Sequence, residues 1–208
     1  MVIRLPLRGI LEVNCYLYAD EETRRGFLID PGARGEELLS WIREQGYTIE
    51  KILLTHGHFD HIGALEVLGG QEGIPVWIHE KGLAWLRDPA LNLSGQFRRR
   101  ITFEGAHPFR DGTVFALEGS PEFCLRAIHT PGHTPDGTVF YDEKHGLAFT
   151  GDTIFRAGRG NDAFPGGNGE QLEESILNRV LTLPPETVLY PGHGEATTVG
   201  EEIHWYRE

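Results

Sequence analysis

The segment His56–His61 carries the densest chemistry in this sequence. It follows the apolar run Ile52–Leu54 and holds three imidazoles and one carboxylate within six positions. Imidazole and carboxylate are the two ligand types that suit zinc, iron and manganese. Four such groups, if buried without a cation to share, would repel one another or lose solvation. A solvated polar loop is the alternative, but matching groups elsewhere in the chain favour a metal site.

Three further side chains of the same types follow at wide spacing. Each lies beside glycine or proline at the end of a short β-prone run, where a turn is expected. Strand ends are rigid positions of the kind that a preorganised site needs. Five histidines and two aspartates exceed one tetrahedral ion and suit two ions, with one aspartate able to bridge. The predicted metal ligands are His56, His58, Asp60, His61, His133, Asp152 and His193.

Alternating and continuous apolar runs indicate the elements that must position these ligands. In the first part we expect strands at Val2–Leu7, Val13–Ala19, Gly26–Ile29, Ile49–Leu54 and Val76–Ile78, with helices at Gly35–Gln45, His61–Leu68 and Lys81–Arg87. In the second part we expect strands at Thr113–Leu117, Phe123–Ile128, Thr138–Tyr141, Leu147–Phe149 and Thr187–Tyr190, with a helix at Gly169–Leu181. Sheets interleaved with helices in both parts indicate an α/β fold with the helices outside.

The segment Asp88–Gly112 is the least regular part, and we read it as a loop or short helices near the mouth of the site. It contains the basic run Arg98–Arg100. A solvated face is the favoured interpretation of such a run. The functional alternative is a small anion-binding patch for a charged substrate.

Composition limits the class of protein. A length of 208 residues fits one domain, spanning 1–208. The net charge of −12 disfavours a nucleic-acid partner, for which a basic patch is the usual footprint. Two distant cysteines, Cys15 and Cys124, do not form a disulfide framework. Arg4 and Arg8 interrupt any leader-like stretch at the N-terminus, and no run approaches membrane-spanning length. We therefore expect a cytoplasmic protein with no membrane partner.

The ligand motifs and their surroundings resemble the metallo-β-lactamase superfamily. The chain looks most like glyoxalase II, the hydroxyacylglutathione hydrolases, in their short bacterial form. The segments that carry the resemblance are Asn14–Leu17, Leu28–Gly32, His56–His61, Thr130–Thr134, Gly151–Phe155, Phe164–Pro165 and Pro191–Gly194. The resemblance implies a four-layer αβ/βα sandwich, an α+β arrangement of two mixed sheets flanked by helices, with the metals at one edge of the sheets. It implies one metal held by His56, His58 and His133, a second held by Asp60, His61 and His193, and Asp152 bridging them.

The sequence departs from that family in two places. The C-terminal helical domain that helps glyoxalase II grip glutathione is not expected here. The family's basic residue near the substrate corresponds to Asn161, and Arg159 or Arg156 is the substitute in this chain. The predicted substrate contacts are therefore Arg159, Asn161 and Phe164. The β-lactamases often use a cysteine ligand in the second site, and Asp152 here, with both cysteines elsewhere, argues against a β-lactamase.

Two metal ions roughly 3.5 Å apart can share a water and lower its pKa toward about 7, which makes hydroxide available as a nucleophile. Asp152 would fix the metal pair, and Asp60 would ligate one metal and orient the water, so both are predicted catalytic residues. A thiolate leaves without a proton donor because its pKa is about 8.5. No spare general acid accompanies the motifs.

A binuclear metallohydrolase acting on a thioester, S-lactoylglutathione or a related acyl-thiol, is therefore the leading prediction, with zinc, iron or manganese as the cofactor. The alternative is a single-iron persulfide dioxygenase of the same superfamily. A nuclease and a non-catalytic metal-binding protein are the weaker readings.

Overall fold

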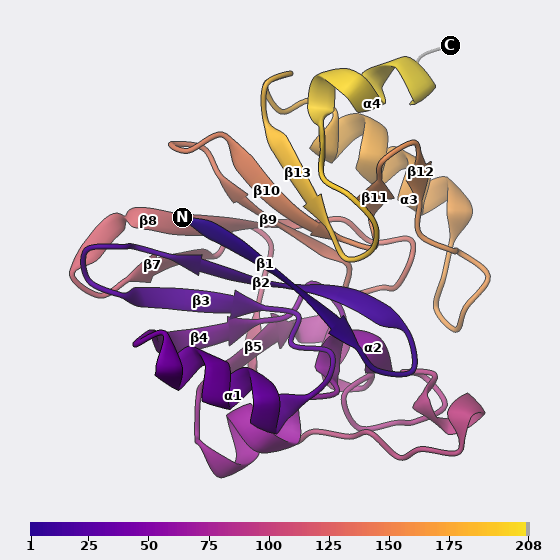
Figure 1. Ribbon diagram of the computed structural model, residues 1–208. Coiled ribbons are helices and arrows are strands. Elements are labelled where there is room, and N and C mark those ends of the chain that lie inside the picture. The colour runs from indigo at the N-terminus through magenta and orange to yellow at the C-terminus, as the bar shows by residue number, and fades with distance from the viewer. Residues whose placement is uncertain (207–208) are drawn as a thin grey trace.

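The computed structural model describes residues 1–206, and two six-stranded sheets packed face to face dominate it (Figure 1). In order across the first sheet lie β1 (Val2–Arg8), β2 (Glu12–Ala19), β3 (Arg25–Ile29), β4 (Thr48–Leu53), β5 (Val76–His79) and β6 (His107–Phe109). The second sheet runs β14 (Thr197–Thr198), β13 (Val188–Pro191), β10 (Leu147–Gly151), β9 (Thr138–Asp142), β8 (Ser120–His129) and β7 (Val114–Leu117). Both sheets contain parallel and antiparallel pairs, as predicted.

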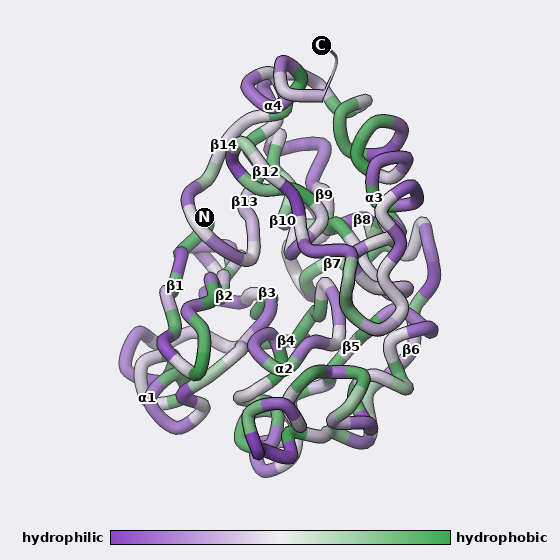
Figure 2. The backbone as a smooth tube through the Cα atoms, turned by 90° about the vertical axis from the view of Figure 1, so that its right-hand side faces the viewer, coloured by the Kyte–Doolittle hydropathy of each residue, from purple (hydrophilic) through white to green (hydrophobic). Residues whose placement is uncertain are grey.

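Helices cover the two outer faces (Figure 1). Helix α1 (Gly35–Glu44) and a π-helical turn (Glu66–Gln71) lie on the first sheet. Helix α3 (Gly169–Ser175), its π-helical continuation (Ile176–Val180) and α4 (Val199–Tyr206) lie on the second. In Figure 2, α3 and the turn after it mix hydrophobic and hydrophilic residues, as an amphipathic covering helix should. The four-layer sandwich is confirmed.

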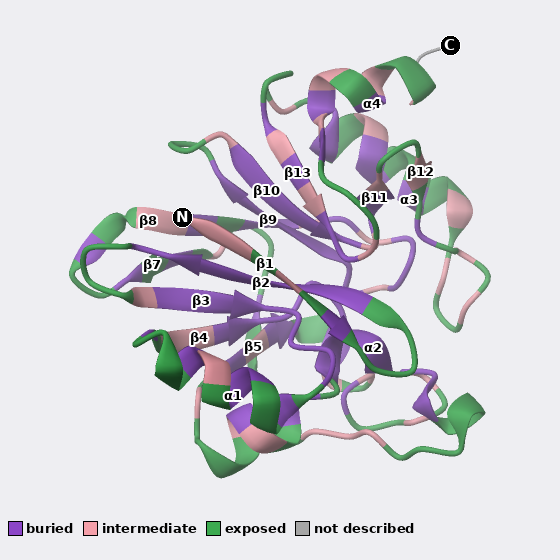
Figure 3. Cartoon of the chain, in the orientation of Figure 1, coloured by how far each residue is buried: buried purple, intermediate pink, exposed green. Residues whose placement is uncertain are grey.

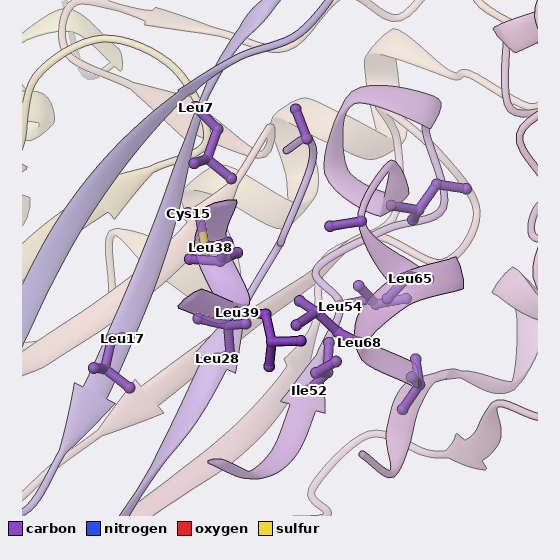
Figure 4. Close-up of a cluster of buried hydrophobic side chains, with 14 of the residues drawn as sticks. Leu7, Cys15, Leu17, Leu28, Leu38, Leu39, Ile52, Leu54, Leu65 and Leu68 are labelled. Atoms are coloured by element: carbon purple, nitrogen blue, oxygen red, sulfur yellow. The ribbon is translucent and has the colours of Figure 1, made fainter. Parts of the chain in front are cut away.

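Strands buried on both faces explain the long apolar runs in the sequence. In β2, Cys15 and Leu17 point to the helical layer, whereas Tyr16 and Tyr18 point between the sheets. Figure 3 shows the central strands buried and the outer faces of the helices exposed. Figure 4 shows the first of the three hydrophobic clusters, where Leu38 and Leu68 of the helical layer meet the sheet. Period-two alternation thus divides each strand between two cores.

Aromatic side chains join the two sheets. The ring of Phe149 lies 5.3 Å from that of Tyr16, 5.8 Å from Tyr18 and 5.6 Å from Tyr190, measured between centroids. Large rings at these separations bury extensive apolar surface and also attract one another through their quadrupoles. This central aromatic layer therefore fixes the positions of the sheet edges, and of the loops that follow them, relative to one another.

The short helices differ from the prediction. The expected helix His61–Leu68 is a four-residue α2 (Phe59–Ile62) followed by the π-helical turn, and Lys81–Arg87 contains only a 3₁₀ turn at Glu80–Leu83. Gly63 and Gly82 lie in these segments, and glycine weakens a helix interior. A second 3₁₀ turn occupies Ser94–Phe97.

Several short elements were not predicted at all. They are β6, β14, α4 and the hairpin of β11 (Ile154–Phe155) and β12 (Gly158–Arg159). Two- and three-residue strands form because a neighbouring strand is present, so they leave little local pattern. None of the helices in residues 1–206 combines the length and the apolar character needed to cross a membrane.

Candidate metal centre

Four strand ends converge on one edge of the sandwich. The segment His56–His61 follows β4 of the first sheet. His133, Asp152 and His193 follow β8, β10 and β13 of the second. Strands β10 and β13 are parallel, with Gly151 beside Pro191, so the residues after them emerge side by side. The parallel register thus brings together side chains that are far apart in the sequence.

The predicted ligands form two groups that touch. In the first group, the Nδ1 atom of His58 lies 3.2 Å from Nε2 of His56 and 3.0 Å from Nε2 of His133. In the second, Nε2 of His193 lies 3.3 Å from Oδ2 of Asp60, and Nε2 of His61 lies 3.9 Å from the same oxygen. Within each group the candidate ligand atoms all lie within 4.8 Å of one another.

Asp152 lies between the two groups. Its Oδ1 is 3.4 Å from Nε2 of His61, while its Oδ2 is 3.6 Å from Nε2 of His133 and 3.6 Å from Nε2 of His193. One carboxylate therefore reaches histidines of both groups. The structure brings together all seven predicted ligands, in the two sets that the sequence resemblance implied; their binding of metal stays a prediction.

The donor set fits divalent cations. Within the described part of the chain, Nε2 of His61 and Oδ1 of Asp152 are buried without a hydrogen-bond partner. Burial and the neighbouring His133 lower the pKa of His58 to about 3, which leaves one of its ring nitrogens unprotonated and able to bind a cation. Burial alone would raise the pKa of Asp152, but His61 and the other imidazoles hold it well below the usual value. Burial alone would lower the pKa of His61, but Asp30 and Asp152 raise it well above the usual value, so a cation bound by His61 would displace a proton. Carboxylates that draw positive charge to a group of imidazoles suit a divalent cation.

Backbone carbonyls orient two of the imidazoles. Nδ1 of His133 lies 2.7 Å from the carbonyl oxygen of Asn161, and Nδ1 of His193 lies 2.6 Å from that of Glu12. A carbonyl oxygen only accepts, so each Nδ1 carries the proton and each Nε2 presents its lone pair to the cluster. Such outer partners set the orientation of a metal ligand.

Asp30 orients one histidine of each group. Its Oδ2 lies 2.9 Å from Nδ1 of His61 and accepts the Thr55 hydroxyl at 2.6 Å. The Thr55 backbone N–H donates to Oδ1 at 2.8 Å. The oxygen of the same hydroxyl lies 3.1 Å from Nδ1 of His56 and can accept from it. Sequence reasoning did not single out Asp30, although it ends a strand just before a Pro-Gly turn, as the ligands do.

A family model described as the metallo-beta-lactamase superfamily matches residues 8–193. The chain belongs to the metallo-β-lactamase superfamily. It is a metal-dependent hydrolase of that superfamily. A probable metallo-hydrolase of Bacillus subtilis, YqgX, is 38% identical over 94% of this chain and 91% of its own length. The hydroxyacylglutathione hydrolase GloC of Haemophilus influenzae is 34% identical over 91% of this chain and 89% of its own.

Solved structures agree with this membership. The BLEG-1 B3 metallo-beta-lactamase superposes with a TM-score of 0.91 at 36% identity, covering 98% of this chain and 97% of that one. TTHA1623, solved in a di-iron-bound form, gives a TM-score of 0.83 at 35% identity, covering 97% and 96%. Divalent metals are used across the superfamily.

Two glycines of this superfamily member make room for the ligand loops. Gly132 has φ +139, and a Cβ there would lie 2.2 Å from the backbone of Leu172 in α3. A Cβ on Gly32 would lie 1.5 Å from the carbonyl oxygen of Asp60. Both positions exclude a side chain because a backbone passes too close, so glycine lets each ligand loop pack against its neighbour.

The three predicted substrate contacts lie at different distances from the cluster. The Phe164 ring is 5.6 Å from that of His58, at the rim of the first group. Asn161 supports His133 through its backbone, and its side chain accepts from the N–H of Ala163. Arg159 pairs with Asp162 at 3.2 Å. Phe164 is thus the one whose side chain adjoins the ligand groups, and all three remain predicted contacts.

His129 lies outside the ligand groups found in residues 1–206. Its ring stacks on His79 with 4.0 Å between centroids and 3° between planes, and its Nε2 lies 2.8 Å from the carbonyl oxygen of Pro135. Burial lowers the pKa of His79 to about 4, and the neighbouring His129 adds to the effect. These contacts indicate a structural role for His129. Neither cysteine belongs to a ligand group either.

Proposed function

We propose that the chain hydrolyses thioesters, with a binuclear centre at the seven-residue cluster. The observation that carries the proposal is the pair of ligand groups joined by Asp152, whose two oxygens face different histidines. Two cations held there would lower the pKa of a shared water and supply hydroxide near neutral pH. His56, His58 and His133 would hold one cation, and Asp60, His61 and His193 the other.

Tyr16, a phenol close to the cluster, cannot protonate a leaving group. Tyr16 donates its hydroxyl hydrogen to the carbonyl oxygen of Pro191 at 2.7 Å, and burial raises its pKa. Its proton is therefore not available for a leaving amine or alkoxide. A thiolate departs unprotonated, because the pKa of a thiol is about 8.5. Phe164 at the rim offers apolar contact to an acyl chain or thioether.

The relatives support the choice of bond. The GloC relative carries the name hydroxyacylglutathione hydrolase, and it matches nearly the whole chain. S-lactoylglutathione is accordingly the first substrate to test, followed by other acyl-thiols. Recognition of glutathione itself is a separate question, because Arg159, the predicted basic contact, is already paired with Asp162.

The test combines metal analysis with a thioester panel. Protein loaded separately with zinc, iron and manganese is mixed with several acyl-thiols, and free thiol is measured. We expect thiol release with two metal ions per chain, and loss of both in Asp152→Asn. Asp142→Asn, which changes a buried aspartate at the far end of β9, is the matched control and should keep both.

Absence of thiol release from every thioester would overturn the proposal. One iron per chain together with oxygen consumption on glutathione persulfide would replace it with the dioxygenase reading. Hydrolysis of β-lactams is a second candidate function, because the chain is similar to the BLEG-1 metallo-beta-lactamase. A chromogenic β-lactam in the same panel measures that activity directly.

A further inference from the structure

A pocket of about 350 Å³ is lined in part by Asp60, one of the predicted metal ligands. Asp60 and Phe59 form one wall, and the turn Gly9–Leu11 between β1 and β2 forms another. Three arginines complete the lining: Arg8, Arg34 and Arg99. We call this the arginine pocket. Its volume falls within the range of small-molecule sites, and it shares Asp60 with the second ligand group.

Basic side chains gather at the arginine pocket of an otherwise acidic protein. The chain carries a net charge of −12, yet three arginines line this pocket. Asp60 is the one carboxylate among the described residues that line the pocket, and it faces His193 of the ligand group. Glu12 and Glu37 pair with two of the arginines, so the positive charge that an anionic ligand can meet is that of Arg99.

Arg99 is the arginine free to meet that ligand. Arg8 pairs with Glu12 at 2.9 Å, and Arg34 pairs with Glu37 at 2.8 Å. No carboxylate of residues 1–206 lies within 4.0 Å of the Arg99 guanidinium nitrogens. An exposed guanidinium with open donors binds a carboxylate through charge-assisted, often bidentate hydrogen bonds.

Hydrogen bonds of a buried asparagine connect the loop that carries Arg99 to α2. The Asn92 side chain donates to the carbonyl of Ile101 at 2.8 Å, and its backbone carbonyl accepts the N–H of Phe59, at the start of α2, at 2.9 Å. The Arg99 N–H donates to the carbonyl of Ser94 at 3.2 Å. Asn92 is fully buried. The backbone of Arg99 is therefore anchored to the segment that carries Asp60.

Apolar side chains lie in the pocket and next to it. Ile10 and Leu11 are 36% and 46% exposed at the tip of the β1–β2 turn. Phe97, 43% exposed, packs its ring 4.9 Å from that of Phe59. These three are among the five large hydrophobic side chains exposed in the described chain. Apolar groups beside a cation suit an organic anion with a short hydrocarbon or thioether portion.

We propose that the arginine pocket binds a carboxylate of the substrate, and that Arg99 makes the deciding contact. The inference rests on the proposed function, because it names the class of acyl-thiol: one with a carboxylate beyond the thioester. The carboxylate can belong to the thiol or to the acyl group, and the experiment separates the two. Arg98 and Arg100 flank Arg99 in the sequence but do not line the pocket, so they serve as matched controls.

The first experiment measures binding without turnover. Metal-loaded protein is titrated by NMR with (methylsulfanyl)acetate, the thioether acid CH₃SCH₂CO₂⁻, and with its neutral amide, neither of which contains a thioester. We expect the anion to bind about fivefold more tightly than the amide, with the preference weakening as salt is added. Arg99→Gln should abolish the preference, and Arg100→Gln should retain it. Equal binding of anion and amide, or an unchanged preference in Arg99→Gln, would overturn the proposal.

The second experiment measures turnover on matched thioesters. S-acetylthioglycolate is compared with its amide for a carboxylate on the thiol, and a succinyl thioester with a butyryl thioester for one on the acyl group. We expect Arg99→Gln to raise KM about fivefold for one anionic substrate and to leave kcat and the neutral substrates unchanged. If no thioester is cleaved, the proposed function is wrong, and the binding experiment still tests whether the pocket binds a carboxylate. If neutral and anionic thioesters are cleaved alike, the pocket proposal fails and the proposed function stands.

Discussion

Replacing Asp30 with asparagine should weaken metal binding without changing any proposed ligand. All three partners of the Asp30 carboxylate are donors: the Thr55 N–H, the Thr55 hydroxyl and Nδ1 of His61. An asparagine amide has one acceptor oxygen, so either orientation turns an NH₂ group toward a donor. Asparagine tolerates the φ of +50 at this position, so the backbone is not the source of the effect.

The expected magnitude follows from the bond that is lost. When the amide introduced by Asp30→Asn points its NH₂ group at His61, Nδ1 must accept, and the ring proton moves to Nε2, the atom that faces Asp152. Losing one charge-assisted hydrogen bond is worth about 1.5–3 kcal/mol, or roughly 10- to 100-fold in affinity. Because the Thr55 hydroxyl also lies beside Nδ1 of His56, both ligand groups should be affected.

Competition with a chromophoric chelator measures that affinity, and elemental analysis gives the metal content. Asp142→Asn is the matched control, because Asp142 is also buried and its Oδ2 lies 2.9 Å from Nδ1 of His145, outside the ligand groups. We expect weaker metal binding in Asp30→Asn and ordinary binding in Asp142→Asn. Equal affinity in wild type and Asp30→Asn would refute the orienting role of Asp30.

Three further substitutions test the fold around the site. Gly132→Ala should lower both stability and thiol release, because its Cβ would meet the backbone of α3; Gly146→Ala, with φ +62 and open space, should lose about 1–2 kcal/mol and keep activity, and equal losses would contradict the close approach. Phe149→Ala should destabilise by about 3–5 kcal/mol in urea denaturation, against about 0.5 kcal/mol for Val114→Ala at a site 57% exposed. His79 has a pKa of about 4 when folded and near 6.5 when unfolded, so the unfolded chain binds more protons and stability falls as pH drops from about 6.5 to 4. At about pH 5, His79→Gln should remove up to about 2 kcal/mol of that loss in the free energy of unfolding. If the free energy of unfolding depends on pH in the same way in both proteins, the lowered pKa of His79 is contradicted.

The sequence predicted the two sheets well because most strands are buried on both faces. Runs such as Ile52–Leu54 contain little besides apolar residues, and a run of that kind needs no partner to be recognised. Short elements were missed for the opposite reason. Strand β6 and the hairpin β11–β12 exist only through pairing, which local sequence does not record. Helix His61–Leu68 was predicted too long because its apolar spacing suggested one continuous helix, whereas the glycine within the segment favours a turn.

The candidate site shows the same division. The seven ligand-type side chains stood out because histidine and aspartate beside glycine turns are unusual enough to notice. Asp30 did not, because a single aspartate at a strand end is common, and only the fold brings it within 2.9 Å of His61. Arg99 was recognised only as part of a basic run. The fold places Arg99, but not Arg98 or Arg100, in the lining of the pocket with Asp60. The hydrogen bonds of Asn92 hold the loop in the conformation that does so.

The connections among these side chains bear on whether one or two cations bind. Asp152 reaches histidines of both groups, and Asp30 reaches His61 directly and His56 through Thr55. Two separate carboxylates thus link the same pair of groups, one at the Nε2 faces of the histidines and one at the Nδ1 faces. Neither group can be reoriented alone, because a change of ring position or tautomer in one alters a bond that the other shares. We therefore predict that a cation in the first group helps to hold the second group in its binding geometry, in line with the binuclear centre proposed above.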